Sequence, residues 1–338
     1  MEKGKYKIVA YGSDVGREGS MENQVLTEGG FDDFSLVYVP EGNRELFLKE
    51  AENADGICAW ADLSEEDYKV MKECEIIVAP AIGADKFDIK GATKRGICIA
   101  NVPDYCLEEV AVHTLALMLD CCRRITLTDR LVRRGIWQEH PPWPMYRMQG
   151  RTYGLVSFGN IPRRVAELVK PFGPDIIAYD PYVDEGVFRE RGVEKAGSLK
   201  ELFERSHFIS VHTPRLPSTY HMIGRSELEN LREGSIIVVT GRGGVVDEEA
   251  LKWALDTGKA GCAGLDVIED EENIRSVLME HEKVVMTSHT AYYTEEASRE
   301  LKRKVMEQII SVVRNKKAPE NLINKEVLGR ARFERRIL

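Results

Sequence analysis

Residues 154–173, GLVSFGNIPRRVAELVKPFG, connect an apolar strand pattern to an amphipathic helix pattern through a short turn. In dinucleotide-binding folds three glycines occupy this turn, because they permit its tight geometry, the approach of a pyrophosphate and close helix packing. Here Gly159 holds the middle position, whereas Ser157 and Pro162 stand at the other two. Taken alone, the turn leaves two interpretations open, a nucleotide site or an ordinary strand-to-helix connection.

Two neighbouring features favour the nucleotide site. Pro162 falls in the first turn of the expected helix, where its missing N–H costs little, so the helix N-terminus can still face a phosphate. Asp180 ends the next strand pattern, about 20 residues beyond the turn, where a carboxylate would bind the ribose hydroxyls. Because no arginine follows Asp180 to accommodate a 2′-phosphate, the sequence predicts NAD rather than NADP.

The same alternation of strand and helix patterns runs through the rest of the chain, which is typical of parallel βαβ units. Strands are predicted at 7–12, 34–40, 56–61, 76–81, 97–103, 153–158, 175–180, 207–212, 235–240, 260–268 and 283–289. Helices are predicted at about 64–74, 108–124, 161–172, 198–205, 226–232, 247–257 and 294–315. The Pro- and Trp-rich segment 137–150 suggests a hinge or a domain edge.

The length of the chain bounds its architecture. A chain of 338 residues exceeds the size at which single hydrophobic cores usually stop growing. We therefore expect an α/β protein of two domains, each a Rossmann-like or flavodoxin-like fold with a doubly wound parallel sheet, and a cleft between them.

Charge and cysteine content exclude several classes of partner. The formal net charge is −9, so phosphate backbones and anionic lipid surfaces are repelled. No apolar run approaches the roughly 18 residues that a membrane span needs. The seven cysteines are odd in number and lack CxxC or Cys/His ligand spacing, which predicts buried free thiols and no metal site. We expect a cytoplasmic protein that binds neither nucleic acid nor membrane.

Three polar residues stand at or just after strand patterns in the second half of the chain. They are Arg242, Glu271 and His289. The carboxyl ends of parallel strands meet at one edge of a sheet, so these side chains can converge there. A histidine can protonate the alkoxide that hydride delivery to a ketone produces, and a carboxylate beside the ring orients it and keeps it protonated. An arginine grips carboxylate and carbonyl oxygens with its planar fork.

Each of these residues also has a simpler explanation. A histidine at a strand end is more often a core or surface residue than a catalytic one. Glu271 lies in the acidic run 269–272, which is typical of a solvated loop. Arg242 is harder to explain structurally, because its neighbouring glycines give the backbone freedom around a cation and contribute little to a core.

Six strings in a fixed order carry a resemblance to a known family. They are DIKGATKRGICIANVPDYCLEEVAVHTLALML (88–119), GLVSFGNIPRRVAELVKPFG (154–173), TGRGGVVDEEAL (240–251), GLDVIEDEE (264–272), HTAYYTEEA (289–297) and PENLINKEVL (319–328). Together they resemble the D-isomer-specific 2-hydroxyacid dehydrogenases nearly end to end. The HTAYYT stretch is most similar to the D-lactate and vancomycin-resistance-type dehydrogenases, and NVPDYC is also similar to the C-terminal-binding-protein branch.

The resemblance implies NAD-dependent, reversible reduction of a small 2-oxo acid to the D-2-hydroxy acid. It implies that Arg242 binds the substrate carboxylate and carbonyl, that His289 is the acid/base and that Glu271 is its partner. Substrate contacts are expected from the backbone of Ile82 and Gly83 and from the side chains of Tyr105 and Tyr292. Cofactor contacts are expected from Ser157, Gly159, Asn160, Ile161, Asp180, His212, Pro214, Thr240, Gly241 and Asp266.

The resemblance also implies a domain division and an assembly. Residues 1–102 with 294–338 would form the substrate domain, residues 103–293 the NAD-binding domain, and two chains a homodimer. Several positions depart from the family pattern, namely Ser157, Pro162, Ala79, Ala81, Val239 and Ser288. Two alternatives therefore stay open, an NAD-sensing interaction protein with vestigial turnover and an oxidoreductase for a different hydroxy substrate.

Overall fold

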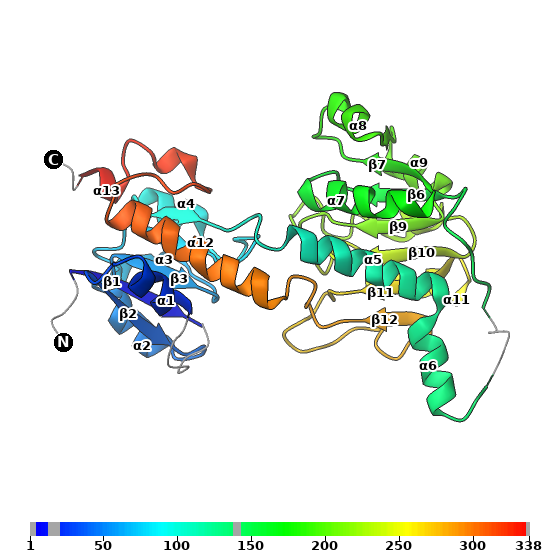
Figure 1. The fold of residues 1–338 in the computed structure, drawn as a ribbon, viewed down its shortest axis with the longest axis horizontal. Coiled ribbons are helices and arrows are strands. Elements are labelled where there is room, and N and C mark those ends of the chain that lie inside the picture. Colours follow the sequence, from blue (N-terminus) through cyan, green and yellow to red (C-terminus); the bar gives the residue numbers. More distant parts are fainter. Residues whose placement is uncertain (1–4, 13–20, 138–142, 336–338) are drawn as a thin grey trace. The chain divides into compact units, whose positions relative to one another are not determined.

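The computed structural model describes residues 5–12, 21–137 and 143–335. The chain forms two compact units, Met1–Tyr105 with Thr294–Leu338 and Cys106–Tyr293. Each unit is built on one sheet whose strands pair in parallel, as Figure 1 shows. The predicted α/β class with two parallel sheets is therefore confirmed.

The sheet of the first unit has the strand order β2-β1-β3-β4-β5, which is the flavodoxin-like order. Its strands are β1 (Tyr6–Tyr11), β2 (Phe34–Val39), β3 (Gly56–Ala59), β4 (Ile76–Val78) and β5 (Cys98–Ala100). Its helices are α1 (Met21–Glu28), α2 (Arg44–Ala51), α3 (Glu65–Val70), α4 (Ile89–Lys94), α12 (Glu295–Val313) and α13 (Arg332–Arg335), with a short 3-10 helix at Lys325–Val327.

A buried asparagine joins the C-terminal segment to this sheet. Asn324, which is 1% exposed, accepts a hydrogen bond from the N–H of Ile99 at 2.8 Å. Its amide nitrogen donates to the carbonyl of Ile97 and to the hydroxyl of Thr93, both at 2.9 Å. Residues more than 220 positions apart in the chain thus share one core.

The helix predicted at 64–74 ends earlier, because α3 stops at Val70. Its start is a capping box, in which the Asp67 carboxylate accepts from the N–H of Ser64 at 2.7 Å. At the other end, the guanidinium of Arg332 donates to the carbonyls of Met71, Lys72 and Cys74. The prediction was wrong here because the N–H of Lys72, which would donate to the carbonyl of Tyr68 in a longer helix, donates to the carbonyl of Glu52 at 3.2 Å.

The sheet of the second unit has the order β12-β11-β10-β9-β6-β7-β8. Its strands are β6 (Thr152–Val156), β7 (Asp175–Tyr179), β8 (Glu194–Lys195), β9 (Phe208–Val211), β10 (Ser235–Val239), β11 (Ala260–Leu265) and β12 (Val284–Met286). The chain enters at β6, adds β7 and β8 on one side and then returns to add β9 to β12 on the other. This reversal beside β6 is the switch point at which doubly wound sheets bind ligands.

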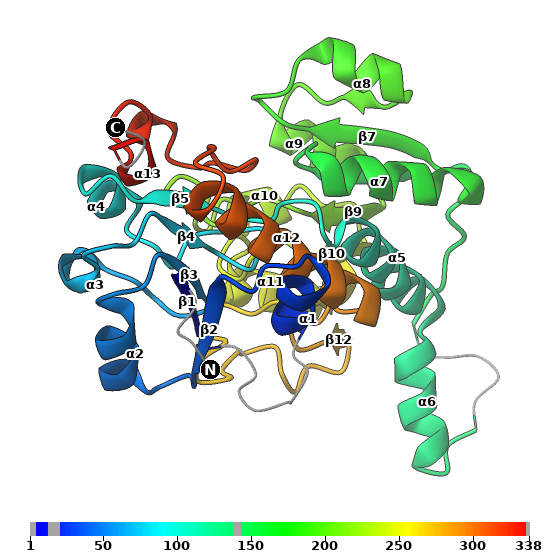
Figure 2. The same ribbon diagram turned by 60° about the vertical axis from the view of Figure 1, so that its left-hand side comes forward.

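Helices cover both faces of this second sheet, as the two views of Figures 1 and 2 show. One core contains side chains of α5 (Leu107–Arg123), α6 (Ile125–Arg133), α7 (Asn160–Val169) and α8 (Glu185–Arg191). The other contains side chains of α9 (Leu199–Arg205), α10 (Arg225–Leu228) and α11 (Glu248–Asp256). Alternate residues of a strand serve opposite cores, since Leu155 joins the first and Val156 the second.

The segment 137–150 lies inside the second unit, so the prediction of a domain edge there was wrong. Residues 138–142 of that segment lie outside the described residues. Beyond them, Met148 is 7% exposed and belongs to the core that α5 and α7 line. Burial of this side chain fixes the segment to the sheet that follows it.

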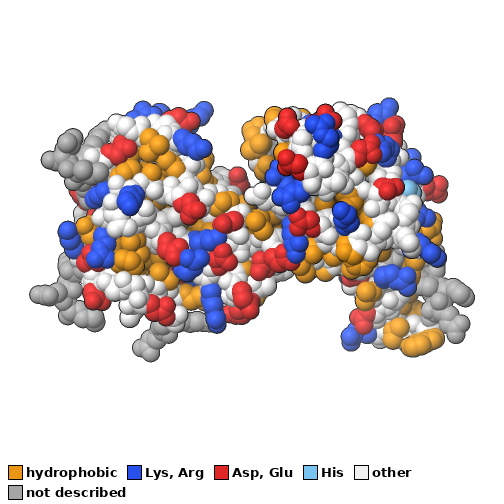
Figure 3. All heavy atoms as spheres, turned by 45° about the horizontal axis from the view of Figure 1, so that its top comes forward, with side chains coloured by type: hydrophobic (Ala, Val, Ile, Leu, Met, Phe, Trp, Pro, Cys, Tyr) orange, Lys and Arg blue, Asp and Glu red, His pale blue; other side chains and the backbone are white. Residues whose placement is uncertain are grey.

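All seven cysteines are free and buried, as their number and spacing predict. On the face drawn in Figure 3, cationic and anionic side chains are interspersed rather than gathered by sign. Within the described ranges, no helix is long and apolar enough to span a bilayer, and no group of His, Cys, Asp and Glu is arranged to hold a metal ion.

Candidate active site

The turn after β6 adopts the geometry of a glycine-rich turn without its first glycine. Ser157 has a φ of 81°, in the left-handed region that side chains rarely adopt. Its N–H donates to the carbonyl of Tyr179 at 2.8 Å, and its hydroxyl lies 3.3 Å from a carboxylate oxygen of Asp180. These contacts hold a strained residue where the motif normally places glycine.

Gly159 is the N-cap of α7, and the N-terminal end of this helix is open. A Cβ built on Gly159 would meet no protein atom within 4 Å, and no side chain caps the helix there among the described residues. The N–H groups of the first turn of α7, which include those of Asn160 and Ile161, therefore point to space at the carboxyl edge of the sheet. An anionic group is favoured at such a helix end.

Asp180 lies at the end of β7 and is 8% exposed. Its carboxylate accepts hydrogen bonds from the N–H of Phe158 and from the N–H of Tyr182, both at 2.9 Å. The carboxylate thus braces the turn that carries Gly159. A carboxylate has capacity for further donors, so ribose hydroxyls can still bind.

The ends of β9 and β10 carry a hydrogen-bonded group of polar side chains. His212 Nε2 lies 2.8 Å from the hydroxyl of Ser210, and its Nδ1 lies 3.3 Å from the hydroxyl of Thr240. Thr240 also contacts the hydroxyl of Thr114 on α5 at 2.8 Å. Burial lowers the pKa of His212 to about 3, so the ring is neutral at physiological pH.

The structure brings His289 and Glu271 together. His289 Nδ1 lies 2.8 Å from Glu271 Oε2, and the two side chains are 40% and 43% exposed. Burial raises the pKa of Glu271, but the hydrogen bond from His289 and the charges of His289 and Arg242 outweigh that effect and lower it below its usual value. Glu271 is therefore a carboxylate at neutral pH, and Nε2 is the ring nitrogen left to face a substrate.

The loop that carries His289 is held by Asp266, which is 1% exposed. The Asp266 carboxylate accepts from the hydroxyl of Thr287 at 2.6 Å and from the N–H groups of Thr290 at 2.9 Å and Ala291 at 3.1 Å. His289 itself has a φ of 52° and donates its N–H to the backbone carbonyl of Asp266 at 2.8 Å. A strained backbone at a candidate acid/base is thus fixed by one buried carboxylate.

The glycines beside Arg242 are required by close packing. A Cβ on Gly241 would lie 2.7 Å from the carbonyl oxygen of Thr213, and one on Gly243 only 1.7 Å from that of Ile268. Neither glycine has a positive φ, whereas Gly244, the third glycine of the string, has a φ of 78°. The predicted conformational freedom is therefore used at Gly244 but not at the two glycines that flank Arg242. The segment after β10 instead packs directly against the backbones of Thr213 and Ile268. This packing places Arg242 near the loop of Glu271.

The other glutamates of the run 269–272 have different surroundings. Glu269 accepts a hydrogen bond from His221 Nε2 at 3.0 Å and another from the hydroxyl of Tyr220. Glu272 is exposed. The fold therefore brings Glu271, and not these neighbours, to His289.

Two contacts around His289 were not predicted from the sequence. The hydroxyl of Thr287, which donates to Asp266, also lies 2.9 Å from His113 Nε2 on α5. The ring of Tyr292 lies edge-on to the imidazole of His289, with centroids 6.4 Å apart. No local pattern marks His113 or Thr287, because their pairing joins residues 174 positions apart.

The remaining predicted substrate contacts belong to the first unit. The carbonyl of Ile82 accepts from the side-chain amide of Asn101 at 2.6 Å, and that of Ala81 accepts from the N–H of Val102 at 3.1 Å. The loop with Ile82 and Gly83 is thereby fixed to the end of β5. Tyr105 is 6% exposed and ends this part of the unit.

Comparison with known proteins places the chain in a family. A model of the D-isomer specific 2-hydroxyacid dehydrogenase, NAD binding domain, matches residues 115–291. The chain is 35% identical over 292 residues to a glyoxylate reductase of Korarchaeum cryptofilum, a match that covers 85% of this chain and 87% of that protein. The chain belongs to the D-isomer-specific 2-hydroxyacid dehydrogenase family. The predicted family, its NAD cofactor and its class, the NAD-dependent dehydrogenases, are thereby confirmed.

Other relatives of the family differ in length and name. The chain is 34% identical over 283 residues to D-3-phosphoglycerate dehydrogenase of Methanocaldococcus jannaschii, which covers 83% of this chain but 54% of that protein. The chain thus spans about half the length of that relative. The structure of a D-lactate dehydrogenase from Aquifex aeolicus with NAD and lactic acid matches with a TM-score of 0.78 and 26% identity over 91% of this chain and 96% of that one. The curated relatives named here are enzymes, so the alternative of an NAD-sensing interaction protein gains no support.

The residues at the carboxyl edge fit the family's cofactor. The open end of α7 at Gly159 suits a pyrophosphate, and the buried carboxylate of Asp180 suits ribose hydroxyls. The neutral His212 adds no charge near the phosphates. Pro214, which was also expected to contact the cofactor, is exposed on the loop after β9. Its carbonyl accepts from the hydroxyl of Thr219 at 2.7 Å.

Two glycine substitutions should have separate effects, one on the binding of NADH and the other on the stability of the protein and the position of the Glu271 loop. Gly159→Ala adds a methyl group that meets no protein atom, so the free energy of unfolding should change by at most about 1 kcal/mol. The methyl would occupy the space above α7, so NADH affinity should fall about tenfold or more. Native NADH affinity in calorimetry would contradict the placement of the pyrophosphate at this turn.

Gly243→Ala is the matched variant. Its methyl would overlap the backbone of Ile268, so the variant should lose roughly 1–3 kcal/mol of stability. To relieve this overlap the backbone of Ile268 must move, and with it the loop that carries Glu271, so turnover should fall as well. Thermal unfolding of both variants, read beside NADH binding, tests the distinction.

Proposed function

We propose that the protein uses NADH to reduce a small 2-oxo acid to the corresponding D-2-hydroxy acid, reversibly. The observation that carries this proposal is the 2.8 Å contact between His289 Nδ1 and Glu271 Oε2, with the charge of Arg242 acting on the same carboxylate. All three residues follow strands at the edge of the sheet where the NAD-binding turn lies. The resemblance of the sequence to the family supports the same roles.

The proposed chemistry assigns one task to each residue. Arg242 would bind the substrate carboxylate and carbonyl oxygen through its fork of N–H donors. Bound NADH supplies a hydride to the carbonyl carbon. His289 gives its Nε2 proton to the carbonyl oxygen, which becomes the hydroxyl, and the ring then regains a proton from solvent. Glu271 stabilises the protonated ring and accepts a hydrogen bond from its Nδ1–H, which orients the ring. In the oxidative direction His289 accepts the proton.

The proposed substrates are acids of the size of glyoxylate or pyruvate. This proposal draws on the similarity to a glyoxylate reductase and to a D-lactate dehydrogenase. In addition to Arg242, the proposed substrate-binding residues are Ile82, Gly83, Tyr105 and Tyr292. An NADH-consumption screen over 2-oxo acids graded by side-chain length tests the size limit.

We also propose a cytoplasmic homodimer. Seven free cysteines suit a reducing compartment. The helix α6 presents apolar side chains to solvent, with Ile125 58% and Val132 48% exposed, and Trp137 beyond it is 82% exposed. Exposed apolar groups that are clustered in this way are typical of a partner surface, and a second copy of the chain is the partner that the family resemblance implies.

Replacement of His289 and Arg242 should have different kinetic effects. His289→Ala removes the proton donor and should lower kcat by roughly 10²–10⁴ with little change in KM. Arg242→Ala should also raise KM, because a charged contact to the substrate carboxylate is lost. His281→Ala, at a histidine that contacts Asp256 instead, serves as the control. Near-native turnover by both site variants would refute the assignment.

The pH dependence should report on Glu271. Glu271→Gln removes the negative charge 2.8 Å from His289 Nδ1 while keeping approximate shape. Proton donation by the ring loses the electrostatic support of that charge, so the decline of the reductive rate should shift to lower pH. The rise of the oxidative rate should shift in the same direction. Glu272→Gln, an exposed neighbour, should shift neither profile, and unchanged profiles in the Glu271 variant would exclude it as the partner.

The assembly can be tested at α6. Val132→Glu places a charge on the exposed apolar surface and should convert a dimer to a monomer in sedimentation equilibrium. Val277→Glu is the matched control, because that valine is 43% exposed elsewhere in the second unit. A monomeric native protein, or equal masses for native and both variants, would contradict the proposal.

A further inference from the structure

Three nitrogen-bearing side chains stand in a row at the amino edge of the second sheet, opposite the proposed active site. Arg151 precedes β6, His207 precedes β9, and Arg232 lies in the turn before β10. In the sheet order β10-β9-β6 these strands are direct neighbours, about 4.8 Å apart. Phe208 pairs with Tyr153 on β6 and with Ile236 on β10, so the residues that precede these strands lie at one edge, where Arg151, His207 and Arg232 line a common pocket.

Backbone hydrogen bonds hold each member in place. The carbonyl of Arg151 accepts from the N–H of Asp175 at 2.9 Å, and that of Arg232 from the N–H of Ser235 at 3.1 Å. The N–H of His207 donates to the carbonyl of Thr152 at 2.9 Å, and the N–H of Thr152 donates back to His207 Nδ1 at 3.2 Å. In the neutral ring, Nε2 therefore carries the proton and is a donor.

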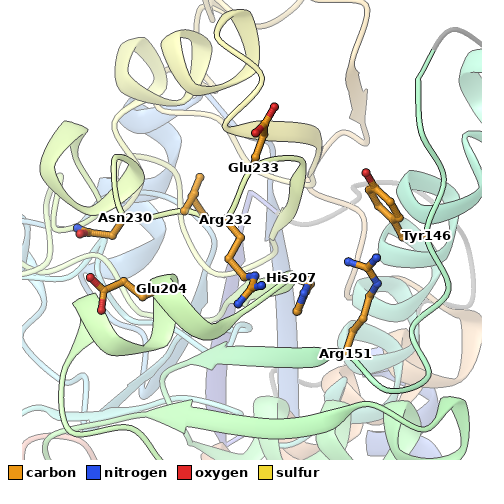
Figure 4. A pocket seen from close by; sticks show the side chains of 8 residues that line it. Tyr146, Arg151, Glu204, His207, Asn230, Arg232 and Glu233 are labelled. Atoms are coloured by element: carbon orange, nitrogen blue, oxygen red, sulfur yellow. The ribbon is translucent and has the colours of Figure 1, made fainter.

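Neither guanidinium of this row forms an ion pair within the described part of the chain. Arg151 stacks on the ring of Tyr146, 4.2 Å from its centroid. Arg205 shows the contrast, because it pairs with Glu194 and Glu201 at 2.6 and 2.8 Å. Figure 4 shows the imidazole of His207 between the side chains of Arg232 and Arg151. Two cations thus flank one imidazole without an intervening carboxylate.

The acidic residues of the same pocket are directed elsewhere. Glu204 lies 3.6 Å from the ammonium group of Lys200. The carboxylate of Glu233 points away from the guanidinium of Arg232 (Figure 4). Burial, followed by the charges of Arg232 and Arg151, lowers the pKa of His207. The row therefore carries uncompensated positive charge in a protein whose net charge is −9.

The pocket in front of this row has a volume of about 470 Å³. Its lining is completed by Tyr146, Asn230 and Leu231. Small-molecule sites typically measure about 300–1,000 Å³, so the space admits an organic group as well as a phosphate. Arginine side chains recognise phosphate oxygens through charge-assisted, often bidentate, hydrogen bonds.

We propose that Arg151, His207 and Arg232 form a second, non-catalytic site that binds the phosphate group of a small phosphate monoester. The two guanidinium groups supply the charge, and the Nε2–H of His207 supplies a further donor. The amino edge holds this site, and the carboxyl edge holds the NAD-binding turn, so both can be filled at once.

Calorimetric titration of the full chain with glycerol phosphate and with inorganic phosphate, at fixed ionic strength in NaCl and without NADH, tests this site. Arg151→Gln and Arg232→Gln should each weaken glycerol phosphate binding by about 10- to 100-fold. Arg189→Gln removes the same charge from α8, where Arg189 pairs with Glu185, and should leave binding unchanged. Tighter binding of glycerol phosphate than of inorganic phosphate is expected, and the reverse order would overturn the assignment of a monoester.

Nuclear magnetic resonance of the His207 ring gives an independent readout. A bound phosphate offsets the charges of Arg151 and Arg232, so the pKa of His207 should rise when glycerol phosphate is added. Absence of binding to the native protein, equal binding by all three arginine variants, or an unchanged titration of His207 would overturn the proposal. None of these measurements depends on turnover, so failure of the proposed reaction would leave this result readable.

Discussion

All strands of the sheet of the second unit run in the same direction, and this single constraint decides where its functional groups lie. Parallel pairing brings every strand's carboxyl end to one edge, so residues as distant as Gly159 and His289 share that edge. The opposite edge collects what precedes the strands, which includes Arg151, His207 and Arg232. Parallel pairing thus separates the edge proposed to bind NAD from the edge that carries Arg151, His207 and Arg232.

Strain is concentrated at the carboxyl edge. Ser157 and His289 both have positive φ angles, and each is held by a buried carboxylate at the end of a strand. Asp180 braces the turn of Ser157, and Asp266 braces the loop of His289. Buried carboxylates with several donors resist rearrangement, because a lost partner would leave a desolvated charge. The rigidity of the proposed active site therefore comes from acids that take no part in the proposed chemistry.

Local charge works against the global charge in this protein. A net charge of −9 repels anions, yet the proposed substrate and the proposed phosphate monoester are both anionic. Arg242 and the Arg151–Arg232 pair supply positive charge at the two places where an anion is proposed to bind. Glu271 sits close enough to Arg242 to moderate that charge, and it stays ionised because His289 and Arg242 favour its carboxylate.

The sequence by itself determined the two α/β sheets, the family and its NAD cofactor, because strand and helix periodicity and the strings around 154–173 and 240–251 are local signals. The family resemblance named Glu271 as the partner of His289, but three glutamates stand within four positions, and only the tertiary structure decided the 2.8 Å contact between Glu271 and the ring. It also decided that the helix from Ser64 ends at Val70, since the N–H of Lys72 donates to the carbonyl of Glu52, and that Gly241 and Gly243 serve close packing. These outcomes depend on groups that meet only after the sheet has formed, and no local pattern encodes the distance between them.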